Sequence, residues 1–406
     1  MGGMDLDRLR AAFPSLTTGA TAGLVRFDGP GGSLVPQVVA DAVAAAMTAG
    51  MCQRGAFTAP EQLTEAVTAQ AREVMGDFLG SDPRGIVFGR SMTSLTMDLA
   101  RTLSADWGPG DEVVVTRLDH DSNIRPWVLA AERTGATVRW LGFDPETTEL
   151  DDVKTVLTDR TRLVAVTAAS NLFGTRTDVA AIAAAAHGRG ALVHVDAVHL
   201  APHVAIDRVA LGADVVTCSP YKFFGPHLGV LAADPGFLET LSPDKLLPSS
   251  DAVPERFELG TLPYEQLAAV TAAVDFIASS ATIAEAGTTR RERLVSAFEA
   301  FGAHEDSLFA RLLVGLDRLS HVRVHGSPSS RTPTLLLQVE GVEPRAVFEH
   351  LAEQGVIAPA GSFYAIEASR HAGLGDAGGV RVGLSPYTTT NDLERLVVGL
   401  GRLGGG

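Results

Sequence analysis

A regular alternation of short β-branched runs and alanine-rich stretches, between about residues 85 and 235, sets the strongest limit on the fold of this chain. The runs around residues 162 and 191 are almost continuously hydrophobic, as expected for strands buried on both faces of a largely parallel sheet. Such strand–helix alternation is typical of an α/β fold with right-handed crossovers. Helices are expected over 92–104 and around 126–134, and strands over 85–89, 111–116, 137–141, 162–167, 191–196, 214–219 and 228–233.

The pattern changes after about residue 285. A long helical stretch over 288–319 leads into strand-like runs and two further helices, which together indicate a smaller α+β domain. The runs cover 322–326, 332–340, 355–359 and 379–385, and the helices 344–354 and 391–402. With 406 residues to divide, we expect a large domain over 20–280 and a small C-terminal domain over 281–406 that also takes in 1–19.

Charge and cysteine content exclude several classes of protein. Lys and Arg number 33 against 48 Asp and Glu, a net charge of −15, which argues against nucleic-acid and anionic-membrane partners. Cys52 and Cys218 lie too far apart for a disulfide framework or a metal-binding pair, and they fit a reducing compartment. The N-terminal segment lacks the apolar core of a signal peptide, and no apolar run approaches the ~18 residues of a membrane span. We expect a soluble, cytoplasmic protein.

Two motifs can be set aside. Residues 373–378 match G-x-G-x-x-G but lead into a strand-like run near the C-terminus, so a loop is expected and not a dinucleotide site. His194, Asp196, His199 and His203 crowd within ten residues and resemble metal ligands. Metal sites usually draw ligands from several segments, and the sequence offers no second cluster, so no metal is expected.

A lysine and an aspartate at successive strand ends carry the chemistry. Asp196 ends the run 191–196, and Lys222 follows the next run. Taken singly, Asp196 could cap a helix and Lys222 could be a solvated loop residue. Together they are what pyridoxal phosphate (PLP) requires, because a lysine amine forms a Schiff base and a carboxylate keeps the pyridine nitrogen protonated. A phosphate cup could form at 91–93, where a strand leads into a helix, with the hydroxyl of Ser219 beside it.

With these residues in place, the sequence resembles the class V aminotransferases, and within them the group II cysteine desulfurases and their relatives. Six segments carry the resemblance in the family's order: 118–127, 170–175, 196–199, 219–222, 256–261 and 380–385. The resemblance implies a PLP-dependent transferase of fold type I, in the α/β class. Such an enzyme has a mostly parallel, seven-stranded type of sheet in its large domain and a smaller α+β domain.

The resemblance also assigns roles. Lys222 forms the Schiff base, Asp196 pairs with the pyridine nitrogen, and His120 stacks on the cofactor ring; these are the expected catalytic residues. Arg381 is expected to bind the substrate α-carboxylate, a role that suits a bidentate guanidinium. The expected cofactor-binding residues are Ser91, Met92, Thr93, His120, Asn171, Asp196, His199, Ser219, Tyr221, Lys222 and Thr261. By resemblance, Thr261 and Arg54 reach across the interface of a homodimer, Arg54 toward the substrate.

The chain departs from the desulfurases in the segment where they carry a mobile nucleophilic cysteine. Residues 358–364 contain no cysteine, and Pro359 stands where such loops usually carry an arginine. Tyr221 replaces the histidine before the lysine, and His199 replaces a glutamine, as in kynureninases and epimerase-like members. Cys218 is expected in the core, and Cys52 is a poor candidate for a replacement nucleophile.

The sequence therefore predicts a PLP enzyme that acts on a small amino acid. Lys222 would first hold the cofactor and then move the proton at the substrate Cα. Transamination, racemisation and β-elimination remain open. One alternative is a cysteine desulfurase or cysteine lyase that releases sulfur without the loop cysteine. Another is a catalytically retired member that serves as a binding protein.

Overall fold

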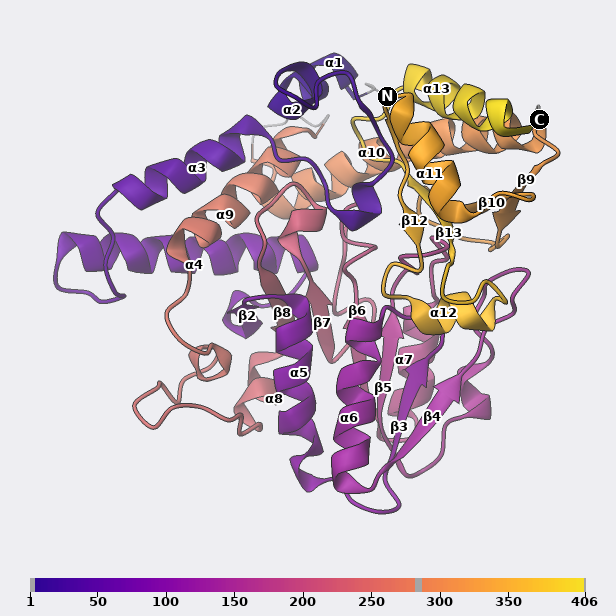
Figure 1. Cartoon of the computed structure of the whole chain (residues 1–406). Helices are drawn as coiled ribbons and strands as arrows, with labels where there is room; N and C mark the ends of the chain where they lie inside the picture. The colour runs from indigo at the N-terminus through magenta and orange to yellow at the C-terminus, as the bar shows by residue number, and fades with distance from the viewer. Residues whose placement is uncertain (1–3, 282–286, 405–406) are drawn as a thin grey trace.

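A seven-stranded sheet forms the centre of the computed structural model, which describes residues 4–281 and 287–404 (Figure 1). Its strands are β2 (Ile86–Gly89), β3 (Glu112–Thr116), β4 (Thr137–Leu141), β5 (Thr161–Thr167), β6 (Leu192–Asp196), β7 (Val215–Cys218) and β8 (Gly229–Ala233). They lie in the order β2-β8-β7-β6-β5-β3-β4, and all neighbours are parallel except β8, which is antiparallel to β2 and β7. The α/β fold and all seven predicted strands are confirmed.

Helices bury both faces of this sheet, which explains why its strands read as continuous apolar runs. Val113 and Val115 of β3 pack on one face with α5 (Met92–Leu103), α6 (Arg125–Thr134) and α8 (Pro235–Glu239). Val114 points to the other face, which α4 (Ala59–Leu79), α7 (Val179–His187) and α9 (Tyr264–Ser279) cover. Helix α3 (Gln37–Thr48) packs outside α9 (Figure 1). The helices expected over 92–104 and around 126–134 are confirmed as α5 and α6.

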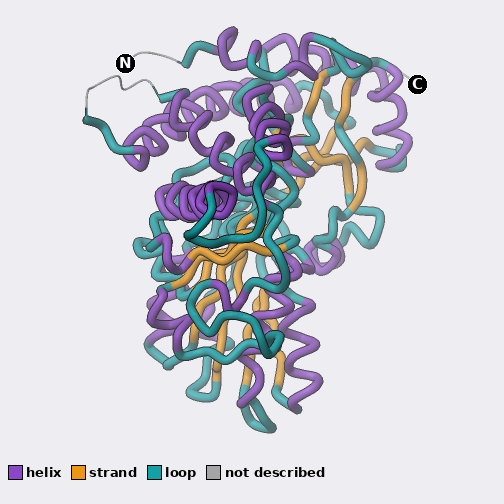
Figure 2. Tube along the Cα trace, turned by 90° about the vertical axis from the view of Figure 1, so that its left-hand side faces the viewer, coloured by secondary structure: helices purple, strands orange, loops and turns teal. Residues whose placement is uncertain are grey.

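The C-terminal part builds a second core around a four-stranded antiparallel sheet in the order β12-β13-β10-β9. Its strands are β9 (Val322–His325), β10 (Thr334–Val339), β12 (Ala360–Gly361) and β13 (Gly379–Gly383), and the helices of this region are α10 (Arg290–Asp317), α11 (Pro344–Glu353), α12 (Ile366–His371) and α13 (Thr390–Gly401). Figure 2 shows the strands of the two sheets as separate groups. The predicted α+β character of this region is confirmed.

The N-terminal segment contributes to both cores. Leu9 of α1 (Leu6–Ala11) and Phe13, which precedes α2 (Pro14–Thr17), pack in the core of the large sheet. Val25 of β1 (Val25–Arg26) packs in the smaller core, and β1 pairs in parallel with β11 (Val356–Ile357). The division into a large domain over 20–280 and a small domain over 281–406 with 1–19 stays a proposal. At the N-terminus the packing is different from this division, because α1 packs in the core of the large sheet and β1 packs in the smaller core.

Short 3-10 helices connect the regular elements at Gly29–Gly31, Pro83–Gly85, Ser104–Asp106, Asp121–Asn123, Val153–Thr155, Pro220–Lys222 and Glu255–Phe257, and another, Arg402–Gly404, follows α13. Parallel strands end at one edge of a sheet, so the loops that follow β3, β5, β6 and β7 converge there. Within the described residues, no helix is long and apolar enough to cross a membrane.

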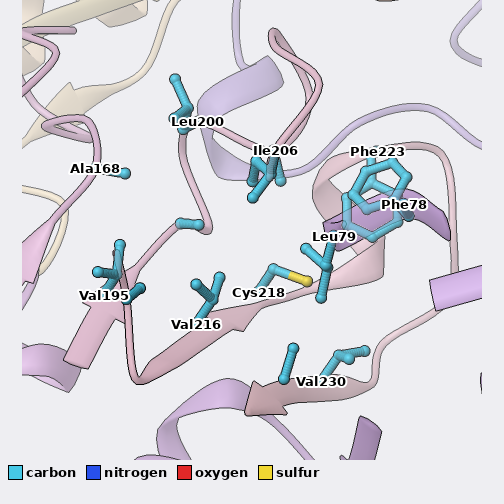
Figure 3. Close-up of a cluster of buried hydrophobic side chains, with 14 of the residues drawn as sticks. Phe78, Leu79, Ala168, Val195, Leu200, Ile206, Val216, Cys218, Phe223 and Val230 are labelled. Atoms are coloured by element: carbon cyan, nitrogen blue, oxygen red, sulfur yellow. The ribbon is translucent and has the colours of Figure 1, made fainter. Parts of the chain in front are cut away.

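The two cysteines lie in contrasting places. Cys218 of β7 is fully buried, and its side chain points among Leu79, Ile206 and Val216 (Figure 3). This burial confirms the prediction that Cys218 is a core residue, and it raises the pKa of the thiol. Cys52 is exposed, in the loop between α3 and α4.

Candidate active site

A cavity of about 650 Å³ opens where the ends of β3, β5, β6 and β7 meet the N-terminus of α5 and segments packed with the smaller core. Eleven of the thirteen predicted site residues line it: Ser91, Met92, Thr93, His120, Asn171, Asp196, His199, Ser219, Tyr221, Lys222 and Arg381. These residues come from segments up to 290 positions apart, from Ser91 to Arg381, so the fold gathers them at one place.

Lys222 and Asp196 bring a buried amine and a buried carboxyl to this cavity. Lys222 ends the 3-10 turn Pro220–Lys222 after β7, and its Nζ donates a hydrogen bond to the carbonyl of Pro30. Burial and the charge of Arg381 lower the pKa of the lysine to about 7, although Asp196 opposes the shift. Burial also raises the pKa of Asp196 to about 6, although the Val198 N–H and Lys222 favour its charged form. Both groups therefore titrate close to neutral pH.

Helix α5 directs its first turn at the cavity. Ser91 is the N-cap, and its Oγ accepts from the backbone N–H of Ser94 at 3.1 Å. The N–H groups of Met92 and Thr93 have no acceptor within the helix, and the positive end of the helix dipole lies there. Gly229 of β8 runs so close that a Cβ would lie 2.1 Å from the carbonyl carbon of Ser91. Such a helix start is suited to an anion such as a phosphate.

His120 presents a neutral imidazole. It caps the 3-10 turn Asp121–Asn123, and its Nδ1 accepts from the backbone N–H of Ser122 at 3.1 Å, so the ring proton lies on Nε2. Burial, with the charges of Lys222 and Arg381, lowers the pKa of His120 to about 4. An uncharged, flat ring at this position can stack on an aromatic cofactor.

A buried polar network supports the loop that carries His120. Asp119 accepts from the side chains of Thr116 and, at 2.6 Å, Asn123. The amide oxygen of Asn123 in turn accepts from Trp127 Nε1 and lies 2.8 Å from His194 Nδ1. Burial raises the pKa of Asp119 to about 8. Asp119 and Asn123 lie in the segment 118–127, where the resemblance to the family singles out only His120.

Arg381 of β13 is buried and aims a partly unsatisfied guanidinium into the cavity. Its Nη1 donates to the carbonyl of Asn171 at 2.9 Å, whereas its Nε has no partner among the described residues. Burial lowers the pKa of Arg381 to about 9, so the group is still charged at pH 7. Asn171 Nδ2 donates to the carbonyl of Phe363 at 2.9 Å, and its Oδ1 has no partner in the described part of the chain. These orphaned atoms indicate a polar ligand.

The histidines of β6 and of the segment after it contact different partners. His194 bonds to Asn123, His199 Nε2 lies 3.1 Å from Thr332 Oγ1, and His203 Nδ1 lies 2.9 Å from the carboxylate of Glu305. Burial holds the pKa of His199 well below its usual range. Across residues 4–281 and 287–404, no group of three or more His, Cys, Asp or Glu side chains is placed to hold a metal ion.

Arg54 and Thr261 do not line the cavity of this chain. Arg54 pairs with Glu65 at 2.8 Å and Glu255 at 2.9 Å on the outer side of α4. Thr261 lies in the loop before α9. The glycine-rich segment 373–378 is a loop between α12 and β13, as predicted.

The structure adds cavity residues that the sequence did not single out. Asp121 and Arg125 follow His120, and Phe363 and Tyr364 lie in the segment where a cysteine was looked for. The signal for this part of the wall is the pair of adjacent aromatic residues, not a thiol.

Comparison with known proteins assigns the family. Residues 25–396 match the family model described as aminotransferase class-V. An uncharacterized protein of Mycobacterium tuberculosis is 35% identical over 98% of this chain and 99% of its own length. A probable cysteine desulfurase of Pseudomonas aeruginosa is 30% identical over 97% of both chains.

Solved structures agree. The cysteine desulfurase CsdA from Escherichia coli has a TM-score of 0.83 and 26% identity, covering 99% of this chain and 98% of its own. A cysteine desulfurase from Thermococcus onnurineus shares the fold, with a TM-score of 0.87 and 24% identity over 100% of this chain and 99% of its own. Since the family model spans nearly the whole chain, the protein belongs to the class V aminotransferase family of PLP-dependent, fold-type-I enzymes.

Proposed function

We propose that this enzyme uses Lys222 to hold PLP and transforms a small amino acid. The observation that carries the proposal is the burial of Lys222 and Asp196 in one cavity with the unsatisfied start of α5. Burying an amine and a carboxyl is costly to a fold, so a retired site has little reason to keep both. The alternative of a binding protein without catalysis is therefore less favoured.

The residues of the cavity match the parts of PLP. The N–H groups at the start of α5, with the hydroxyl of Ser219, would hold its phosphate. Asp196 would pair with the pyridine nitrogen, His120 would stack on the ring, and Asn171 and His199 would lie near the phenolic oxygen. When bound, PLP supplies an electron-withdrawing ring that stabilises negative charge at the substrate Cα.

Arg381 would orient the substrate. Because Nη1 is engaged with Asn171, the Nε and Nη2 edge of the guanidinium remains for a carboxylate, which it can bind through two parallel hydrogen bonds. Lys222 Nζ, with a pKa of about 7, can then take a proton from the substrate Cα and return it. The charge of Arg381 adds to the effect of burial in lowering the pKa of this amine, so the amine can release its proton near pH 7.

Transamination, or related chemistry at Cα or Cβ, is favoured over sulfur transfer. The probable cysteine desulfurases among the relatives favour sulfur release from L-cysteine as the second candidate. Transfer of sulfur to a protein thiol requires a cysteine near the cofactor. Neither Cys52 nor Cys218 lines the cavity, and residues 358–364 contain no cysteine.

We further propose a homodimer in which Arg54 and Thr261 approach the cavity of the partner subunit. The end of α3, the loop to α4 and the loop before α9 lie on the same side of the molecule (Figure 1), and each of these segments carries exposed large apolar side chains. They are Met47, Phe57, Leu246, Leu247 and Leu259. Several large apolar side chains exposed on one side of a molecule favour a protein interface there.

The test is to add a panel of small amino acids, L-cysteine included, to the PLP-loaded enzyme. Keto acids and sulfide are measured in parallel with the visible spectrum of the cofactor. Keto-acid formation without sulfide supports transamination, and sulfide or alanine from L-cysteine supports the desulfurase alternative. A stable cofactor band that no amino acid changes would contradict both, and would favour the binding-protein alternative.

A further inference from the structure

Two consecutive residues of the cavity wall have an unusual backbone. Phe363 has a φ of 53° and Tyr364 a φ of 59°, in the left-handed region that large side chains rarely adopt. Such strain persists only where the surroundings impose it, and it gathers at functional sites. The surroundings of the Phe363–Tyr364 turn therefore determine its backbone conformation and the direction of its rings.

The loops of the large domain hold this turn through its carbonyl groups. Asn171 Nδ2 donates to the carbonyl of Phe363 at 2.9 Å, and the N–H of Asp121 donates to the carbonyl of Tyr364 at 2.8 Å. Within the turn, the N–H of Ala365 donates to the carbonyl of Ser362 at 2.8 Å. The partners Asn171 and Asp121 both line the cavity, so the site itself fixes the turn.

The turn places its two rings on two different site residues. The guanidinium carbon of Arg381 lies 3.7 Å from the ring centroid of Phe363. The ring of Tyr364 stacks on His120, with centroids 5.4 Å apart and planes 30° apart, although the tyrosine is 76% exposed. The aromatic pair thus forms a wall of the cavity that runs from Arg381 to His120.

This wall faces the space that the proposed function gives to the substrate, and the inference rests on that function. Lys222, Arg381 and the Phe363–Tyr364 turn line the same cavity, so a substrate whose carboxylate binds Arg381 and whose Cα lies near Lys222 would share that cavity with the turn. We propose that this turn sets the substrate class: the ring of Tyr364 limits the Cα substituent to a small side chain, and the ring of Phe363 positions Arg381. Tyr364 is then the specificity-determining residue and Phe363 a positioning residue.

Unreactive carboxylates of increasing size test the wall by a direct binding measurement. Propionate, 4-methylpentanoate and 3-phenylpropionate match alanine, leucine and phenylalanine without the amine, and calorimetry with the PLP-loaded enzyme gives their Kd values. We expect the wild type to bind propionate at least about tenfold more tightly than 4-methylpentanoate, because the ring of Tyr364 would exclude the additional carbon atoms of the larger acid.

Four variants separate the roles of Tyr364 and Phe363. Tyr364→Gly removes the ring while suiting the left-handed backbone, and Tyr364→Asn is a second small residue that tolerates it. Both should cut the Kd ratio of 4-methylpentanoate to propionate by about fivefold or more. Tyr364→Phe keeps the ring and should leave the ratio within about twofold of the wild type. Phe363→Leu should raise the Kd values of all three acids by a common factor, because Arg381 binds the carboxylate of each of them.

The outcomes are distinct. A ratio that stays at its wild-type value in both Tyr364→Gly and Tyr364→Asn overturns the inference and leaves the proposed function intact. If no carboxylate binds the wild type, the anchor at Arg381 is wrong and the inference falls with it. Failure of the proposed function is read separately, from the amino-acid panel.

Discussion

Burial tunes the individual charged groups of this site toward neutral pH. The ordinary pKa of a lysine is 10.5, and that of Lys222 is lowered to about 7 by desolvation and the charge of Arg381. Asp196 moves in the opposite direction, to about 6, for the same reason of burial. A lysine of this kind can both lose and regain a proton at pH 7, which acid–base catalysis at one carbon atom requires.

This shift predicts the pH dependence of cofactor uptake. Only the neutral amine of Lys222 can attack the aldehyde of PLP, so the uptake rate of the cofactor-free enzyme should rise with pH, reach half its limit near pH 7 and level off well below pH 10.5. Arg381→Ala removes a cation that lowers this pKa, so the midpoint should move to higher pH. Stopped-flow absorbance at a series of pH values measures the rate. A wild-type midpoint near pH 10 would contradict the assignment.

The free energy of unfolding should follow the same titration. Between pH 7 and 10.5 the unfolded chain holds a proton on Lys222 that the folded, cofactor-free chain has lost, so this group makes stability increase with pH across that range. Lys222→Met should flatten that part of the profile, which urea denaturation at several pH values can follow.

Arg381 should be required for binding substrates but not for binding the cofactor. Arg381→Ala should weaken carboxylate binding by about a hundredfold, the loss expected when a charge-assisted pair is removed, while PLP is still taken up. Arg381→Lys keeps the charge but loses the pair of parallel hydrogen bonds, so its affinity for carboxylates should lie between those of the wild type and Arg381→Ala. Calorimetry with propionate and the visible spectrum measure the two effects separately, and loss of both in Arg381→Ala would show that its role is wrong.

At the scale of elements, the sequence predicted the large sheet well because burial on both faces leaves a clear pattern. Each of its seven strands was expected to within one residue of its observed ends. The two-residue strand β11 lies within the predicted run 355–359, whereas β1 and β12 were not expected, because their pairing depends on tertiary contacts between distant segments. The Phe363–Tyr364 turn was missed for a similar reason: its left-handed backbone is imposed by Asn171 and Asp121, far away in the sequence.

One close contact between elements should be essential to the cofactor site. A Cβ on Gly229 of β8 would lie 2.1 Å from the carbonyl carbon of Ser91 and 2.4 Å from the nitrogen of Met92. Gly229→Ala should push the start of α5 away, destabilise the fold by about 2–4 kcal/mol and reduce the affinity for PLP.

Thermal denaturation and PLP titration measure the two effects. Gly302→Ala in α10 is the matched control, since a Cβ there would meet nothing within 4 Å in the described part of the chain and alanine favours a helix. Equal behaviour of the two variants would show that the approach of β8 to α5 does not shape the cofactor site.

At the scale of the whole molecule, one chain assembles eleven predicted site residues but not Arg54 and Thr261. The sequence of one chain gives the type and order of its residues but not the contacts between subunits. The family resemblance assigned Arg54 and Thr261 to a subunit interface, which a single chain does not contain. Their place beside exposed Phe57 and Leu259 is the reason for proposing a dimer.

Disrupting this apolar surface should affect both assembly and cofactor. Phe57 is 95% exposed, and Phe57→Glu would place a charge in the proposed interface. We expect light scattering to show a wild-type dimer and a monomeric variant, with weaker PLP binding in the monomer. Val314→Glu, at an exposed apolar site on α10, should change neither property. A monomeric wild type would refute the proposed dimer.

Mapping the cofactor on the chain tests whether Lys222 holds it. The enzyme loaded with PLP is reduced with borohydride, digested and analysed by mass spectrometry, with Lys222→Ala treated in parallel. We predict one pyridoxyl group, on Lys222, and a visible absorption band that the variant lacks. A modified residue other than Lys222, or a reducible band that persists in Lys222→Ala, would contradict the account.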